Sequence, residues 1–420
     1  MKFNRLNSLA LAATALCLSA QVMAQDAPLD PNSPKAIAKK AGDAIGLEFD
    51  GYARGGFHSA TGDSQKGGYS LGGSLQFYRL GNEGNNYAEF GIKKKFDLGQ
   101  GLNWGVYYMP KVYNGDSGTA QIYSYMSGLS FAPELQLWAG QRFHRVEDVH
   151  IVDNWVMQDG DNYGAGVDGI RIGDVAKLNV SIHTDGNNDN NDKSTNDGKR
   201  VNFQLLGIAT NPGGKLNITG GVHGGDYSLG KKGMAFGLLH NQKNFVFEGL
   251  SNSFFVQGSS GHSSITGQFY NLDNAGAPQA GAKQFRVIEA FTWQSGKFGG
   301  QALAGYHSIT PDSGVFDGKK TTDLSVGGRV SYGIAKQVKL LGEVGLTSRK
   351  TEDQEKQKLY KYTAAVAFSP DTDFWTRPEF RVYVNRANWN SAAAAANAMS
   401  YGANGQKKAT TFGVQMEVWW

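Results

Sequence analysis

The chain ends with Thr410-Thr411-Phe412-Gly413-Val414-Gln415-Met416-Glu417-Val418-Trp419-Trp420. Successive side chains of a β-strand face opposite sides. One face is therefore wholly apolar, with Phe412, Val414, Met416, Val418 and Trp420. A soluble sandwich can show the same alternation, but a terminal aromatic residue is typical of an outer-membrane β-barrel, whose last strand ends in the aromatic girdle. We predict that the apolar face meets lipid and that Trp419 points into the barrel among polar residues.

The composition supports one large closed sheet. The 420 residues contain no Pro/Ser-rich linker or shift in composition after residue 50, which argues against two or three soluble domains. A helical membrane protein is excluded, because the mean hydropathy is −0.40 and no run of about 18 apolar residues exists outside the N-terminus. A barrel needs no such run, since only alternate residues face lipid. The 57 glycines and the 12% of aromatic residues indicate many short strands joined by turns and loops.

Residues 1–24 have the order of a secretory signal peptide. Lys2 and Arg5 precede the apolar run Leu9 to Leu18, and small residues end at Ala24, where we predict cleavage. The only cysteine, Cys17, leaves with this segment, so no disulfide or thiol chemistry is expected. Cleavage removes two of the 41 lysines and arginines and leaves 39 against 37 acidic residues. This balance gives no indication of nucleic-acid binding.

Residues 25–48 are expected to form a short periplasmic segment, with one short helix from Ile37 to Ile45, and residues 49–420 the barrel. About eighteen strand patterns follow residue 50, an even number that fits a bacterial barrel. The connections alternate between tight turns, such as Asn211-Pro212-Gly213-Gly214, and long polar stretches, such as 186–199 and 388–408. Short periplasmic turns and long outer loops are the usual asymmetry of such barrels.

One long connection, His144 to Asn162, mixes charges with bulky apolar residues. That mixture suits a loop folded into the lumen better than a loop in water. Asp148, His150 and Asp153 within it are also the residue types of a metal site, but a hydrogen-bonded loop is the simpler interpretation of that spacing. We predict no metal site, no cofactor and no enzymatic activity.

Alternation in other strands predicts further inward side chains. Tyr52 lies on the polar face of its strand, and Tyr87 points inward together with Glu89. Near residue 380 the inward set is Trp375, Arg377, Glu379, Arg381 and Tyr383. Aromatic faces beside charged hydrogen-bonding groups suit sugars, because rings stack on the sugar face and charges bind hydroxyls. The alternative is that these aromatics fill space or belong to the interfacial girdle.

Several motifs together resemble the maltoporins, the sugar-specific porins, from about Phe49 to the end of the chain. They are Tyr78-Arg79-Leu80-Gly81-Asn82-Glu83 with Tyr87-Ala88-Glu89, Leu137-Trp138-Ala139-Gly140 with Arg142-Phe143, Asp148-Val149-His150 with Asp153, Asn211-Pro212-Gly213-Gly214, Trp375 with Arg377-Pro378, and the ending Phe412 to Trp420.

This resemblance implies an eighteen-stranded homotrimeric barrel whose third loop narrows the channel, in which maltooligosaccharides slide along aromatic residues beside polar tracks. The slide candidates are Tyr52, Tyr87, Trp375 and Trp419, with Phe255 further along on the inward face. The polar-track and constriction candidates are Arg79, Glu89, Arg142, Arg145, Asp148, Asp153, Trp155, Arg377 and Glu379.

Three departures from the maltoporins affect the expected channel. Trp155 stands in place of a constriction tyrosine, and Val146 and Ile122 stand in place of track arginines. Tryptophan is larger than tyrosine and has only one polar donor. We therefore expect a narrow lumen with a small, cation-leaning conductance.

The leading hypothesis is a channel of the bacterial outer membrane for maltose, maltodextrins or related oligosaccharides. A porin selective for sucrose or other glycosides, a general diffusion porin, and a receptor or enzyme barrel are the alternatives. The expected partners are an oligosaccharide, outer-membrane lipid and two further copies of the chain. A periplasmic sugar-binding protein is an additional candidate partner.

Overall fold

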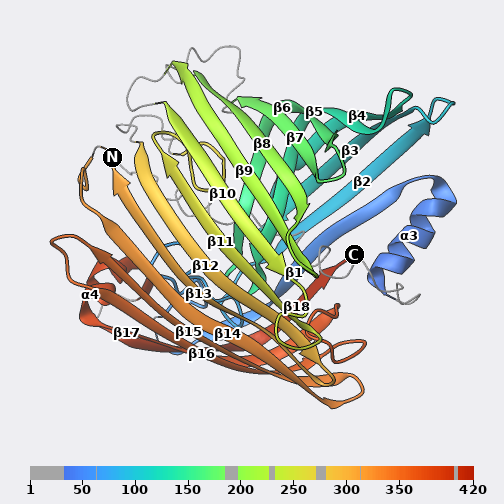
Figure 1. The fold of residues 1–420 in the computed structure, drawn as a ribbon. Helices are drawn as coiled ribbons and strands as arrows, with labels where there is room; N and C mark the ends of the chain where they lie inside the picture. The colour runs from blue at the N-terminus through green and yellow to red at the C-terminus, as the bar shows by residue number, and fades with distance from the viewer. Residues whose placement is uncertain are drawn as a thin grey trace.

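Eighteen antiparallel strands form the wall of the barrel in the described part of the chain (Figure 1). The structure, a computed structural model, describes residues 33–62, 64–184, 197–226, 232–270, 281–312, 314–401 and 405–420. The predicted signal peptide lies outside these residues. The strands are β1 (Glu48–Ala60), β2 (Tyr87–Asp97), β3 (Asn103–Tyr113), β4 (Asp116–Leu129), β5 (Ala132–Val149), β6 (Asn154–Ile172), β7 (Ala176–Thr184), β8 (Asp197–Ala209), β9 (Gly214–Asp226), β10 (Gly233–Gln242), β11 (Leu250–Ser260), β12 (Ala282–Ser295), β13 (Phe298–Pro311), β14 (Thr321–Ala335), β15 (Val338–Thr351), β16 (Gln357–Phe368), β17 (Glu379–Trp389) and β18 (Lys408–Trp419).

The sheet closes because β1 pairs with β18 on one side and with β2 on the other. Tyr52 lies opposite Trp419 in the first pair and opposite Glu89 in the second. Every other strand pairs with its neighbours in sequence. The predicted eighteen-stranded antiparallel barrel is therefore confirmed.

Side chains alternate across the wall as the strand period requires. In β16, Leu359, Lys361 and Thr363 are buried, whereas Tyr360 and Tyr362 are exposed on the outside. The same alternation places Ile122 of β4 on the outside with 50% of its surface exposed. Ile122 therefore does not face the lumen. The expectation that it replaces an arginine of the polar track beside the sugar path was wrong.

The hairpin of β5 and β6 continues past the barrel wall and turns inward. A 3-10 turn, η2 (His150–Val152), joins its two strands. Val149, Ile151 and Val156 on this hairpin pack against the wall in the largest apolar cluster, which also contains Leu239 and Phe255. The predicted inward loop 144–162 thus corresponds to a hairpin anchored by its apolar face.

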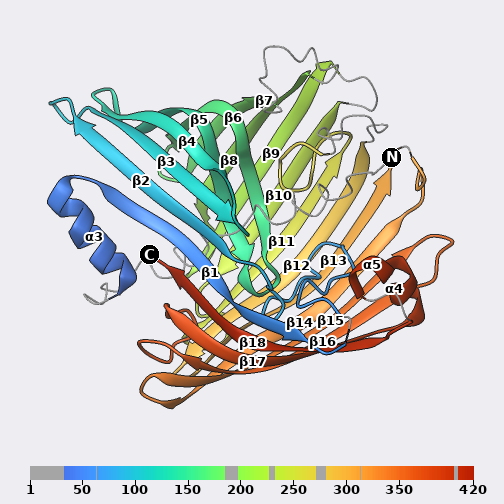
Figure 2. The same ribbon diagram turned by 180° about the vertical axis from the view of Figure 1, so that it is seen from behind.

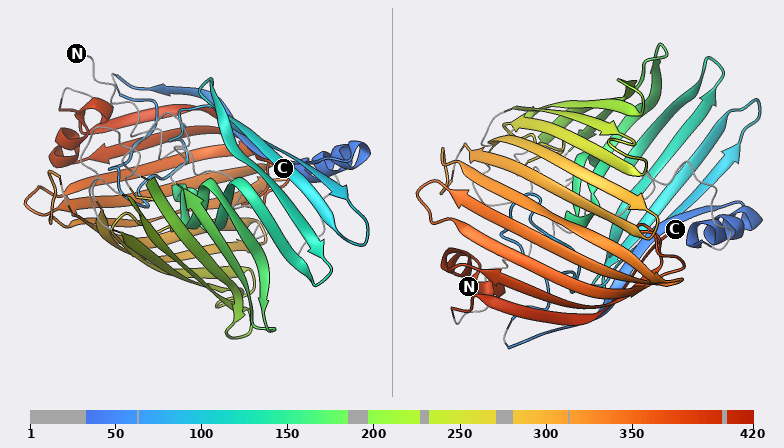
Figure 3. Two further views of the ribbon diagram at one scale, coloured as in Figure 1. Left: turned by 90° about the horizontal axis from the view of Figure 1, so that it is seen from above. Right: turned by 60° about the horizontal axis from the view of Figure 1, so that its bottom comes forward.

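The connection between β1 and β2 also enters the barrel (Figures 2 and 3). The Tyr78 hydroxyl lies 3.0 Å from Ser325 Oγ on the opposite wall. A Cβ atom at Gly327 or Gly345 would come within 2.5 or 2.2 Å of the Tyr78 ring, so glycine permits this close approach. The Leu80 backbone N–H donates to Glu343 at 2.9 Å, which holds the segment against the wall.

Three helices lie outside the wall pattern in the described residues. The predicted N-terminal helix is α3 (Pro34–Ile45). The Ser33 side chain caps its N-terminus, and the helix ends at Gly46, which has the left-handed backbone conformation. It lies beside β1 at the end of the barrel that carries the C-terminus (Figures 1 and 2). The short α4 (Ser391–Ala396) and α5 (Ala398–Tyr401) follow β17. No helix in the described ranges is long and apolar enough to cross a membrane.

Candidate functional site

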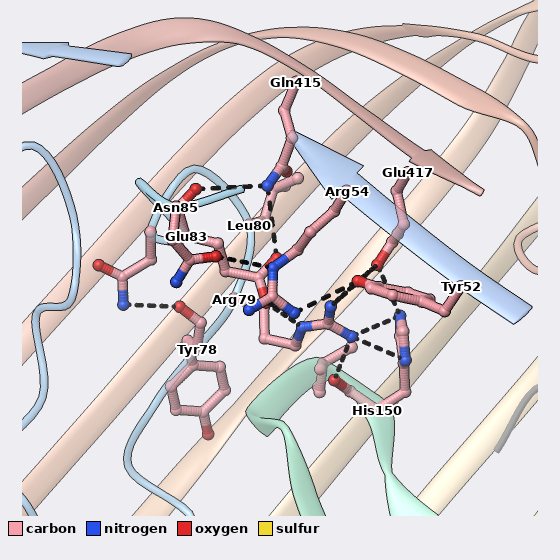
Figure 4. Close-up of polar contacts among 12 residues, drawn as sticks. Tyr52, Arg54, Tyr78, Arg79, Leu80, Glu83, Asn85, His150, Gln415 and Glu417 are labelled. Carbon is pink, nitrogen blue, oxygen red and sulfur yellow. Dashed lines mark hydrogen bonds and ion pairs between the residues drawn. The ribbon is translucent and has the colours of Figure 1, made fainter. Parts of the chain in front are cut away.

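Arg79, on the connection between β1 and β2, is the centre of a buried polar network (Figure 4). Its Nε donates to Glu83 at 2.7 Å, and its Nη2 donates to the Tyr52 hydroxyl at 2.6 Å. The same Nη2 lies 2.9 Å from Glu417 of β18, and Nη1 lies 3.0 Å from the His150 ring. Arg79 therefore connects the β1–β2 segment, the inward hairpin and the barrel wall.

Glu417 extends the network along the wall. It accepts from Arg377 at 3.0 Å and also pairs closely with Arg381. Arg381 in turn lies 3.0 Å from Glu379, which pairs with Lys339 at 2.8 Å. These groups are at most 2% exposed, and buried charges of this kind persist only when they are paired.

The network holds more positive than negative groups. Arg54, which lies 3.3 Å from Glu83, joins Arg79, Arg377, Arg381 and Lys339, so five cations face the carboxylates of Glu83, Glu379 and Glu417. This excess of two cations opposes the cation-leaning selectivity expected from the sequence.

The predicted slide aromatics form a row from one end of the barrel towards the other. Tyr87 begins at the long-connection end and lies 6.2 Å from Tyr52, measured between ring centroids. The Arg54 guanidinium lies over both rings, at 5.3 and 5.8 Å. Both tyrosines are almost fully buried, and their hydroxyls donate to Glu89 and Glu417.

Trp375 and Trp419 continue this row at the short-turn end. His150 meets both indoles edge-on, at centroid distances of 5.3 and 5.6 Å. The Arg377 guanidinium lies 4.2 Å from the Trp419 ring centroid. Both indoles are partly exposed, so each retains ring surface that another flat molecule can contact.

Phe255 does not extend this row. It points inward, as its parity requires, but the hairpin covers it completely and leaves it 0% exposed. It belongs to the apolar cluster with Val149 and Val156. The expectation that Phe255 offers a surface to sugar is corrected accordingly, and its role is to anchor the hairpin.

The remaining polar candidates lie apart from Arg79. Arg142 pairs with Asp168 at 2.7 Å and lies over Trp138 at 5.2 Å. Arg145 lies over Trp155 at 4.7 Å, and Trp155 faces Asp148 across the hairpin. Trp155 is 5% exposed, and its neighbours Val156 and Met157 both belong to the apolar cluster against the wall.

The hairpin tip carries two titratable groups in buried surroundings. Burial raises the pKa of Asp153 to about 7, although Arg79 and Arg54 oppose the shift and Asp148 adds to it. Burial and the nearby Arg79 hold the pKa of His150 well below its usual range. His150 is therefore neutral, and Asp153 changes charge near neutral pH.

Six members of the network were not among the predicted site residues: Arg54, Glu83, His150, Lys339, Arg381 and Glu417. Arg54 and Glu417 have inward parity in the sequence, so alternation alone could have identified them. Glu83 and His150 lie on connections, where no periodicity indicates a direction. Among the described residues, no group of three or more His, Cys, Asp or Glu side chains is arranged to hold a metal ion.

Comparison with known proteins finds a match to the LamB porin family over residues 47–420. Solved structures with a similar fold include OpdQ of Pseudomonas aeruginosa, with a TM-score of 0.48 and 9% identity over 89% of this chain and 98% of that chain. An anion-selective porin from Comamonas acidovorans has a TM-score of 0.46 and 10% identity over 89% and 99% of the two chains. A loop-deletion mutant of OmpT from Vibrio cholerae has a TM-score of 0.47 and 10% identity over the same shares.

Proposed function

Because this chain belongs to the LamB porin family and forms a closed barrel of the outer membrane, we propose that it conducts maltose, maltodextrins or related linear oligosaccharides by facilitated diffusion. The family and the fold point to a channel rather than to an enzyme. We further propose that the working form is a homotrimer and that the sugar is its small-molecule partner.

The partly exposed Trp419 and Trp375, at one end of the aromatic row, are the observation that carries this proposal. Both tryptophans keep part of their ring surface exposed, which allows the apolar face of a sugar ring to stack on them. Tyr52 lies opposite Trp419 in the β1–β18 pair but is only 2% exposed, so the two tryptophans are the rings of the row that sugar can contact.

Charged groups beside the row are buried and hold its rings in place. Arg377 lies over Trp419, and Arg54 lies over Tyr52 and Tyr87. Hydrogen bonds to ionised groups are about twice as strong as neutral ones. Pairing with Glu417 and Glu83 fixes the two guanidinium groups, so little order has to be gained when sugar binds.

Swelling of proteoliposomes tests this proposal against a general diffusion porin. We expect maltotriose to enter faster than uncharged solutes of similar mass, and we expect entry to saturate with concentration. The double variant Trp375→Ala with Trp419→Ala should lose this advantage, whereas Trp104→Ala, on the outer surface, should keep it.

Entry rates that follow molecular size alone would favour a general porin instead. A preference for sucrose over maltose would move the assignment to another glycoside class.

A further inference from the structure

A groove of about 410 Å³ crosses the outer face of β14 to β17. These are the orange and red strands at the front of the right-hand view in Figure 3. Its lining is Gly328, Val330, Gly342, Val344, Tyr362, Ala364, Val384 and Arg386, with parts of Glu343 and Thr363.

The groove opens towards the membrane rather than the lumen. Val330, Val344 and Val384 are 40%, 41% and 50% exposed on the outside of the wall, whereas the intervening Glu343 is buried on the inside. A Cβ atom at Gly342 would meet only Val330 Cγ2, at 3.6 Å. Glycine thus leaves open space on the floor of the groove, bordered by valine side chains.

Arg386 lies at one end of the groove, on the same outward face. Its Nη1 donates to Thr410 at 2.7 Å, and no ion pair with a carboxylate is found for it in the described ranges. Arginine on the lipid face costs about 2–4 kcal/mol at the bilayer midplane but only about 0–1 kcal/mol near the interface. The depth of Arg386 therefore decides how much its exposure to lipid costs and whether an anionic headgroup can reach it.

Neighbouring strands place Arg386 at the interface. Along β17 the outward residues before it are Phe380, Val382 and Val384, and Asn388 follows it. The outward side chains of β18 change from apolar to polar between Phe412 and Thr410, and the next outward residue towards the same end is Lys408. Arg386 is therefore at headgroup level, towards the end of the barrel with the long connections.

We propose that this groove binds one acyl chain of a membrane lipid and that Arg386 binds the phosphate group of the same lipid. A planar guanidinium offers paired donors that match phosphate oxygens. The apolar groove is continuous with the lipid-facing wall, and its cation lies at the height where an anionic headgroup would be. Lys408, opposite Asn388 in the β17–β18 pair, adds a second positive charge at that level.

Native mass spectrometry of the purified barrel with added lipid tests the proposal. The probes are lipid A, its dephosphorylated form and phosphatidylcholine. Gly342→Leu fills the floor of the groove, and Arg386→Gln removes the charge. Matched controls are Ala139→Leu, at an exposed alanine of β5, and Arg171→Gln, at an exposed arginine of β6.

We expect each groove variant to lose one tightly bound lipid A molecule per chain, and we expect both controls to retain it. Dephosphorylated lipid A should bind to the wild type less often. Equal lipid counts in all four variants would overturn the proposal. Loss of the oligomer in Gly342→Leu with an unchanged lipid count would also overturn it, because the face would then be an interface between copies. Heat-modifiable migration on gels checks that each variant is folded.

Discussion

Replacement of Trp419 by alanine gives a direct measure of stacking in the proposed channel. The Trp419 ring is partly exposed, touches His150 at its edge and lies below the Arg377 guanidinium. Its removal takes away one ring surface without removing a charge. Arg377 keeps its pairing with Glu417 at 3.0 Å, so the polar network should remain in place.

The expected loss follows from one aromatic contact. Stacking contributes about 0.5–1.5 kcal/mol, which corresponds to roughly 2- to 12-fold in the dissociation constant of the sugar. Trp419→Phe keeps a ring and should lose less. Trp375→Ala should have an effect of the same size, because Trp375 contacts His150 in the same edge-on manner at 5.3 Å.

The assay is block of the ion current through single channels by maltotriose in planar bilayers. Ion conductance before sugar is added should be unchanged or higher in the variants, because each removes bulk from the lumen. A sugar dissociation constant within twofold of the wild type in both Trp419→Ala and Trp375→Ala would refute the reasoning. The rings would then have a structural role only.

Four further results are expected. Trp155→Ala should enlarge the ion current more than substitution of Trp375 or Trp419, because it removes a large ring from the hairpin and the ring on which the Arg145 guanidinium lies. An unchanged single-channel current would contradict this expectation, and Trp104→Ala is the control. Because burial raises the pKa of Asp153 from 3.8 to about 7, the folded barrel holds this proton better than the unfolded chain does. The free energy of unfolding should therefore fall as pH rises through this range, and preference for cations in a KCl gradient should increase. Asp153→Asn should reduce both trends, and Glu147, whose pKa burial raises to about 8, should account for the remainder. Glu417→Gln weakens the counter-charge of three arginines and should lower the free energy of unfolding in urea by about 3–5 kcal/mol, the usual cost of breaking a buried pair. His150→Ala should weaken sugar block through both tryptophans, and His150→Phe, which keeps a ring edge, should restore part of it.

The wall of the barrel was predictable because it repeats a simple period. Outward and inward residues of β18 follow the alternation read from Thr410 to Trp420. The positions of Tyr52, Tyr87 and Trp419 follow from the same rule. β5 and β6 extend into the region from His144 to Asn162, which was expected to be a loop, because both strands continue into the inward hairpin.

The inward segments could not be derived in the same way. Tyr78 and Leu80 lie inside because they meet Ser325 and Glu343 from distant strands, and such contacts leave no periodic signal. His150 was interpreted as a loop residue for the same reason. Its contacts with Arg79 and both tryptophans exist only after four separate segments meet.

Ile122 was wrongly assigned for a different reason. The resemblance to maltoporins placed it on the polar track, although strand alternation places it on the outer face. A shift of one residue moves a side chain to the other face of a strand. Gln121 and Tyr125 of β4 are buried on the inner face, so Ile122 must face outward. The strand pair also contains a register shift between Met109 and Pro110, which residue-by-residue matching does not anticipate.

Titration of the single-channel current with a series of linear maltodextrins tests the central claim most directly. If the partly exposed rings of Trp419 and Trp375 bind sugar, the current should fall in a saturable way, and the affinity should rise from one sugar unit to the chain length that contacts both rings. A current that stays constant at every sugar concentration and every chain length would contradict the account.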